Sequence, residues 1–128
     1  KDMGAHKLDE SDDYPDFASA VAEKVSGDYE NAKGIVICAS GIGVDIVANK
    51  FSRVRAALVD TPDQAFDARN DEDANILALG ADRVDAQTAR QIVSTWLGTP
   101  RSEDERHRRR RDKISSLELK LQNKSKNL

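Results

Sequence analysis

Three short apolar runs, separated by longer amphipathic stretches, set the pattern of this chain. The runs cover residues 34–38, 56–59 and 75–80, and they are rich in β-branched and small apolar residues with no regular polar alternation. Such runs are typical of strands that are buried on both faces of a parallel sheet. We therefore predict three strands, with 34–38 in the centre of the sheet, and the end of one further strand at 1–4.

Apolar residues at helical spacing fill the stretches between these runs. Five helices are predicted. The first begins near Tyr14 and stops at Gly27, the second begins within or just after 41–43, and the third follows an N-cap at Thr61. The fourth spans 85–97, and the fifth runs from a capping box at Ser102 to about residue 122. Strand and helix alternate, which predicts a Rossmann-like, doubly wound α/β domain with parallel strands and right-handed crossovers.

The length fits one domain, residues 1–128. Three strands are few for an open doubly wound sheet. Lys1 stands where an initiator methionine would be, so we expect an N-terminal strand–helix unit to be missing ahead of it.

The run at 34–38 leads into a glycine loop and then into a helix. Ser40, Gly41 and Gly43 interrupt the extended run and allow a tight turn with positive φ. A strand, a glycine loop and a helix N-terminus together direct main-chain N–H groups at one point, which favours an anion. Cys38, the single cysteine of the chain, ends the strand at the mouth of this loop, so we predict the chemistry there.

Composition and charge exclude several classes of protein. Charged residues make up 34% of the chain, and the net charge of -3 argues against a nucleic-acid partner despite the arginine-rich stretch at 106–111. One cysteine leaves no internal disulfide and fits a reducing compartment. No apolar run approaches the roughly 20 residues that span a membrane. We therefore expect a soluble, cytoplasmic protein with no membrane partner.

Several stretches, taken together and in order, resemble the ribose-5-phosphate isomerase B and galactose-6-phosphate isomerase family. They are residues 13–15, 34–43 with 48–50, 55–57, 73–80, 92–97, and 106–107 with 109–110. The resemblance implies a five-stranded parallel sheet, a homodimer or a tetramer built from dimers, and a phosphorylated sugar as substrate. It also implies reversible aldose–ketose isomerisation with no metal and no organic cofactor.

The resemblance assigns roles around the glycine loop. Cys38 matches the cysteine that removes a proton next to the sugar carbonyl, and Gly41, Ile42 and Gly43 match the loop that steadies the negative oxygen of a cis-enediolate. Ser40 keeps the hydroxyl that the family has near this cysteine. A free thiol, with a pKa of about 8.5, needs such N–H groups to act as a base near neutral pH. The alternative is that Cys38 is an ordinary buried strand residue.

Further residues match substrate contacts of the family. Asp13 and Tyr14 match residues near the sugar ring. The alternative is that both simply mark the start of a helix. Arg106 and Arg110 lie four apart on one helix face and match arginines that bind the sugar phosphate, often across the subunit interface. The helix at 102–122 is therefore expected at the dimer interface. The alternative for both arginines is a solvated basic face.

The other arginines of the run are predicted to form such a solvated face, balanced by the acids at 103–105. They are Arg108, Arg109 and Arg111. His107 is expected to pack or to cap rather than to catalyse.

Two departures from the family pattern bear on activity. The family's N-terminal Asp-His pair, which contacts the substrate, has no counterpart in this chain, and Asp71 and Glu72 stand where the family often has His-Asn. That histidine is thought to help open the sugar ring. A carboxylate with a raised pKa can exchange a proton with a ring oxygen, so Asp71 is a candidate for this step. An exposed loop acid is the alternative.

The leading hypothesis is an isomerase that interconverts ribose 5-phosphate and ribulose 5-phosphate. An isomerase of a hexose phosphate is the near alternative. A non-catalytic sugar-phosphate-binding or assembly subunit would keep the sheet, the loop and the dimer helix. A serine hydrolase is disfavoured, because Cys38 and Ile42 flank Ser40 where a nucleophile elbow has glycines.

Overall fold

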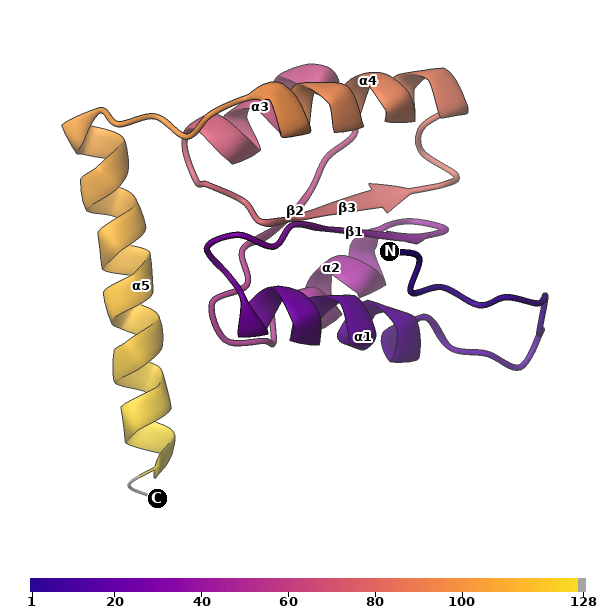
Figure 1. Cartoon of the computed structure of the whole chain (residues 1–128), viewed down its shortest axis with the longest axis horizontal. Coiled ribbons are helices and arrows are strands. Elements are labelled where there is room, and N and C mark those ends of the chain that lie inside the picture. Colours follow the sequence, from indigo (N-terminus) through magenta and orange to yellow (C-terminus); the bar gives the residue numbers. More distant parts are fainter. Residues whose placement is uncertain (127–128) are drawn as a thin grey trace.

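Strands and helices alternate along the chain, as the hydrophobic pattern predicts (Figure 1). The computed structural model describes residues 1–126. In chain order the elements are α1 (Tyr14–Gly27), β1 (Gly34–Cys38), α2 (Ile42–Ala48), β2 (Ala56–Leu58), α3 (Pro62–Asn70), β3 (Ile76–Gly80), α4 (Ala86–Gly98) and α5 (Glu105–Lys126). The strands pair in parallel in the order β1-β3-β2. The doubly wound α/β class is therefore confirmed, with three strands within residues 1–126.

β3 is the centre of the sheet, and all five of its residues are buried. Successive side chains of a strand point to opposite faces. Ile76 and Ala78 accordingly pack with α1 and α2, whereas Leu77 and Leu79 pack with α3 and α4. Figure 1 shows the same two helical layers on either side of the sheet. Each face of β3 thus supports its own hydrophobic core.

The prediction that residues 34–38 form the central strand is wrong. β1 lies at an edge of the sheet, and Ile35 and Ile37 are 38% and 58% exposed. An apolar run indicates that a strand is hydrophobic. The position of that strand in the sheet depends on how the connecting helices pack. The predicted strand end at 1–4 is also wrong, because those residues have no regular structure.

The start of α3 is confirmed, and the start of α5 needs correction. The hydroxyl of Thr61 accepts the N–H of Gln64 at 3.2 Å, with Pro62 at the first helical position. α5 begins at Glu105, three residues later than the capping box predicts. The hydroxyl of Ser102 accepts the N–H of Asp104 at 3.1 Å instead, so the helix starts just beyond this turn.

α5 stands outside the two layers, at the end of the sheet where the strands begin (Figure 1). Its 22 residues span on the order of 33 Å. Two polar contacts hold its C-terminal half to the turn before β2. The N–H of Arg53 donates to the carboxylate of Glu118 at 2.8 Å, and the amide of Gln122 donates to the hydroxyl of Ser52 at 2.8 Å. None of the helices within residues 1–126 is long and apolar enough to cross a bilayer.

Candidate active site

The turn after β1 brings a thiol and a row of main-chain amides together. Gly41 has φ +78°, and a Cβ there would lie 2.5 Å from the Leu58 side chain and 2.8 Å from the main-chain nitrogen of Gly80. Only glycine fits this position without strain. The tight turn lets the N–H of Gly41 donate to Sγ of Cys38 at 3.2 Å. The predicted positive φ is therefore confirmed at this glycine.

The electrostatics of the turn favour a thiolate. Burial raises the pKa of Cys38, but hydrogen bonding from the main-chain N–H groups of Val44, Gly41, Ser40 and Gly43 outweighs burial and leaves the pKa below that of an ordinary thiol. Converging N–H groups of this kind stabilise an anion. The turn can therefore hold a thiolate, or an oxyanion of similar size, without any cationic side chain.

The hydroxyl of Ser40 lies at the start of the following helix. Its oxygen accepts the N–H of Ile42 at 3.2 Å, which leaves the hydroxyl proton available to donate to another group. Ile42 itself is largely exposed. Ser40 can therefore both brace the loop and hydrogen-bond a ligand beside it.

A cavity of about 780 Å³ opens beside the turn, and Cys38 forms part of its wall. The cavity is also lined by Tyr14 and Phe17 of α1 and by Ile35 and Ile37 of β1. The half-buried thiol thus borders this open space, which residues 1–5 also line, in contrast to the ordinary buried strand cysteine considered above.

Tyr14 lies directly against the glycine loop. A Cβ at Gly43 would overlap the Tyr14 ring, so this second glycine allows the close approach of α1. Asp13 precedes α1 but makes no side-chain hydrogen bond to cap it. Helix capping therefore does not account for this carboxylate, whereas Tyr14 packs beside the cysteine turn.

The remaining predicted site residues lie at the opposite end of the sheet. Cys38 pairs with Gly80 where β1 and β3 end, whereas Asp71 lies in the loop that precedes β3. The length of β3, on the order of 15 Å, separates the two places. Arg106 and Arg110, both exposed, project from the first turns of α5 near this second place. The candidate residues of one chain therefore fall into two groups at opposite ends of the sheet.

Asp71 is half-buried rather than an exposed loop acid. Its Oδ1 lies 3.6 Å from Nε2 of His107, whose side chain is only 13% exposed. The other ring nitrogen of His107, Nδ1, is buried and has no hydrogen-bond partner among residues 1–126. His107 therefore packs, as predicted, and it does so against Asp71. Glu72 is exposed beside them.

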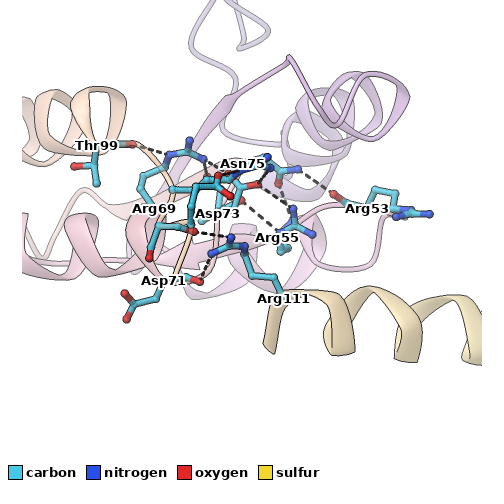
Figure 2. A network of polar contacts seen from close by, with 12 residues as sticks. Arg53, Arg55, Arg69, Asp71, Asp73, Asn75, Thr99 and Arg111 are labelled. Carbon is cyan, nitrogen blue, oxygen red and sulfur yellow. Dashed lines mark hydrogen bonds and ion pairs between the residues drawn. The ribbon is translucent and has the colours of Figure 1, made fainter. Parts of the chain in front are cut away.

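A polar network that the sequence did not reveal supports the Asp71 loop (Figure 2). Asp73 has φ +53°, and its carboxylate accepts hydrogen bonds from Arg69 at 2.9 Å and from Arg55 at 3.4 Å. The Asn75 side chain accepts the N–H of Arg55 at 2.7 Å and donates to the carbonyl of Arg53 at 2.9 Å. The only signal in the sequence was the match of 73–75 to the family, which carried no role.

The solvated basic face is confirmed for two of the three other arginines and wrong for the third. Arg108 and Arg109 are exposed, whereas Arg111 is buried, with 7% of its surface exposed. It points back to the loop of Asp71, as Figure 2 shows. The spacing of the arginines could not predict that Arg111 is buried, because the helical period is the same whichever face of the helix packs against the protein. Within residues 1–126, no three His, Cys, Asp or Glu side chains are grouped to hold a metal ion.

These features define a class of protein. The chain is a doubly wound α/β domain with a half-buried thiol at the carboxyl end of a strand, beside a glycine loop whose N–H groups lower the pKa of that thiol.

Comparison with known proteins agrees with this class. A model of the Ribose/Galactose Isomerase family matches residues 1–114. Ribose-5-phosphate isomerase B of Escherichia coli is 41% identical over 109 residues, which are 85% of this chain and 72% of that protein. The chain belongs to the ribose/galactose isomerase family.

Solved structures of relatives have the same fold. Ribose-5-phosphate isomerase B of Mycoplasma genitalium with bound ribulose-5-phosphate superposes with a TM-score of 0.87 at 41% identity, covering 91% of this chain and 76% of that one. The enzyme of Clostridium thermocellum superposes with a TM-score of 0.85 at 44% identity, covering 94% and 80% of the two chains.

Proposed function

We propose that this chain is an aldose–ketose isomerase that interconverts ribose 5-phosphate and ribulose 5-phosphate. The observation that carries the proposal is the Cys38 thiol, whose pKa the main-chain N–H groups of the glycine loop lower. A base of this kind, beside donors that also suit an oxyanion, fits proton transfer next to a carbonyl. The relative from Mycoplasma genitalium binds ribulose-5-phosphate. A single thiol used in its reduced form fits a reducing compartment such as the cytoplasm.

The proposed reaction moves one proton between neighbouring carbons. The Cys38 thiolate takes the proton from C2 of the aldose; the electron pair of that C–H bond forms a C1–C2 double bond, and the C1 carbonyl oxygen becomes negative. N–H groups of the Gly41 and Gly43 loop stabilise this enediolate, at about 3 kcal/mol per donor. The C2 hydroxyl proton moves to O1, and the thiol returns its proton to C1. A ketone remains at C2 and the thiolate is regenerated.

We further infer that each complete site is built from two copies of this chain. Cys38 with Tyr14 lies at one end of the sheet, and Asp71 with the two exposed arginines of α5 lies at the other. A substrate of five carbons cannot reach both within one chain. In a symmetric dimer, the second half-site of one copy can face the first half-site of the other.

The outer face of α5 supports this arrangement. Ile114, Leu117 and Leu121 recur at helical spacing, continue the stripe that begins with Arg106 and Arg110, and are exposed. An exposed apolar stripe is typical of an interface. A second copy that covers it would bring the two arginines to the substrate phosphate. Asp71, near the same helix, would exchange the proton that opens the sugar ring.

A different phosphorylated sugar is the second candidate substrate. Asp71 and Glu72 stand where the family often has His-Asn, and two carboxylates change the hydrogen bonds offered to a sugar ring. An assay must therefore distinguish turnover of ribose 5-phosphate from turnover of a hexose phosphate and from binding without turnover.

The direct test is turnover of a panel of sugar phosphates by the purified chain. We expect ribose 5-phosphate to be converted to ribulose 5-phosphate, with allose 6-phosphate and galactose 6-phosphate as the comparison substrates. Chelators should not change the rate. If a phosphorylated sugar binds but none is turned over, the non-catalytic subunit replaces the enzyme as the function.

Arg110→Ala is expected to raise KM for ribose 5-phosphate by roughly 10- to 100-fold, because a charge-assisted hydrogen bond to phosphate contributes about 1.5–3 kcal/mol. The effect on kcat should be smaller, since the arginine contacts a part of the substrate that does not react. Steady-state kinetics measure both. Arg108→Ala, which removes the same charge from an exposed position on the same helix, is the control. An unchanged KM for Arg110→Ala would remove this residue from the phosphate site.

A further inference from the structure

We propose that Arg111 is a positioning residue of the isomerase site: it ties the loop of Asp71 to the helix that carries Arg106 and Arg110. The inference rests on the proposed function for its kinetic consequence. It concerns a side chain that does not reach the substrate, because its guanidinium is turned inward.

The guanidinium of Arg111 bridges two segments of main chain. One nitrogen donates to the carbonyl oxygen of Asp71 at 3.1 Å, and the other donates to the carbonyl oxygen of Ser102 at 2.7 Å. No carboxylate of residues 1–126 lies within 4.0 Å of it. Arg111 is thus a buried cation that is satisfied by carbonyl groups, not one half of an ion pair. The flat fork of arginine suits this double contact, whereas lysine offers one ammonium group.

The linker before α5 and the end of α3 are already joined by two hydrogen bonds. The N–H of Ser102 donates to the carbonyl of Asn70 at 2.8 Å, and Nε of Arg69 donates to the carbonyl of Thr99 at 3.4 Å. These bonds fix the linker before α5 to the end of α3. They do not involve α5 itself, so the direction of the helix depends on contacts made from within it.

Arg111 supplies two such contacts near the site, both hydrogen bonds to main-chain carbonyl groups, and His107 adds a 3.6 Å side-chain contact with Asp71. Among the described residues of this helix it is the buried one, and no apolar side chain in the first turns anchors the helix to the sheet. The contacts of Glu118 and Gln122 lie two or more turns further on. Without the Arg111 bridge, the turns that carry Arg106 and Arg110 would be held to Asp71 by the longer His107 contact alone, and their position relative to Asp71 would be less fixed. Shifts of about 1 Å at a binding group are enough to reduce catalysis strongly.

The test compares Arg111→Met with Arg108→Met. Both remove one positive charge from the same helix, but only the first side chain is buried. We expect Arg111→Met to raise KM for ribose 5-phosphate about tenfold, with a smaller fall in kcat, and Arg108→Met to leave both near the wild-type values. Arg111→Lys should fall between them, since it keeps the charge and one of the two bonds. A general loss of folding would instead lower the active fraction and leave KM unchanged.

Amide hydrogen exchange supplies a readout that does not require turnover. Exchange should accelerate at residues 70–75 and in the first turns of α5 in Arg111→Met, and it should not change in Arg108→Met. If Arg111→Met does not fold, Arg111→Lys serves for both measurements. Unchanged KM together with unchanged exchange would overturn the role of Arg111. If the wild-type chain turns over no sugar phosphate, the proposed function fails, and exchange alone decides whether Arg111 fixes the helix.

Discussion

Cys38→Ala is expected to lower kcat for isomerisation by at least about a thousandfold, because no other group near the glycine loop can replace the base. The variant should fold and should still bind phosphorylated sugars, since the thiol fills little volume and its loop contacts are made by the main chain. Coupled spectrophotometric turnover and sugar-phosphate titration measure the two properties. Retained turnover would remove the assignment of Cys38 as the base.

The pH dependence of the thiol gives an independent check. Because main-chain N–H groups lower the pKa of Cys38, the thiolate should form at a lower pH than in a free cysteine, and kcat/KM should rise with pH through that lowered value and then level off. The chain has one cysteine, so the rate of alkylation by iodoacetamide reports this ionisation directly. The urea-unfolded chain is the control and should titrate as an ordinary thiol. Identical midpoints for the two forms would contradict a stabilised thiolate.

Mixing two variants that are each nearly inactive at substrate concentrations below KM is expected to restore activity. In the proposed dimer, each site combines Cys38 of one copy with the α5 arginines of the other. A heterodimer of one Cys38→Ala subunit and one Arg106→Ala/Arg110→Ala subunit therefore has one intact site and one site with both alterations. Random exchange of subunits should therefore give about a quarter of the wild-type activity at substrate concentrations below KM. Size-exclusion chromatography with light scattering measures the assembly itself.

The control is to combine all three substitutions in one chain and mix it with an excess of Cys38→Ala. This mixture contains no copy with an intact thiol and should stay inactive. If the first mixture also remains inactive although subunits exchange, the two half-sites do not meet across an interface. A monomer with full activity would exclude the composite site altogether.

Local features of the site were predictable because each depends on neighbours in sequence. Cys38 ends a strand, and Gly41 and Gly43 follow within five residues, so spacing alone was enough to predict a turn with amides aimed at the sulfur. The N-cap at Thr61 was predictable for the same reason. The family resemblance then supplied a chemical role for the cysteine.

Features that depend on long-range packing were not predictable. Arg111 has the same helical spacing as its exposed neighbours, and only the contact with the carbonyl of Asp71, 40 residues earlier, makes it a buried bridge. The contact of His107 with Asp71 likewise joins segments that are far apart in the chain. The network around Asp73 joins its loop to Arg69 and Arg55. No local pattern encodes which of several similar arginines is turned inward.

The alternation of strands and helices and the cysteine turn could be predicted from the amino-acid sequence, because the hydrophobic period, glycine and proline act over a few residues. Only the packed chain shows that β3 and not β1 is central, and that Cys38 and Asp71 lie at opposite ends of the sheet. Strand order and the placing of a helix follow from burial of side chains that are distant in the chain. Burial is a property of the packed molecule, so it is decided only when all layers are in place.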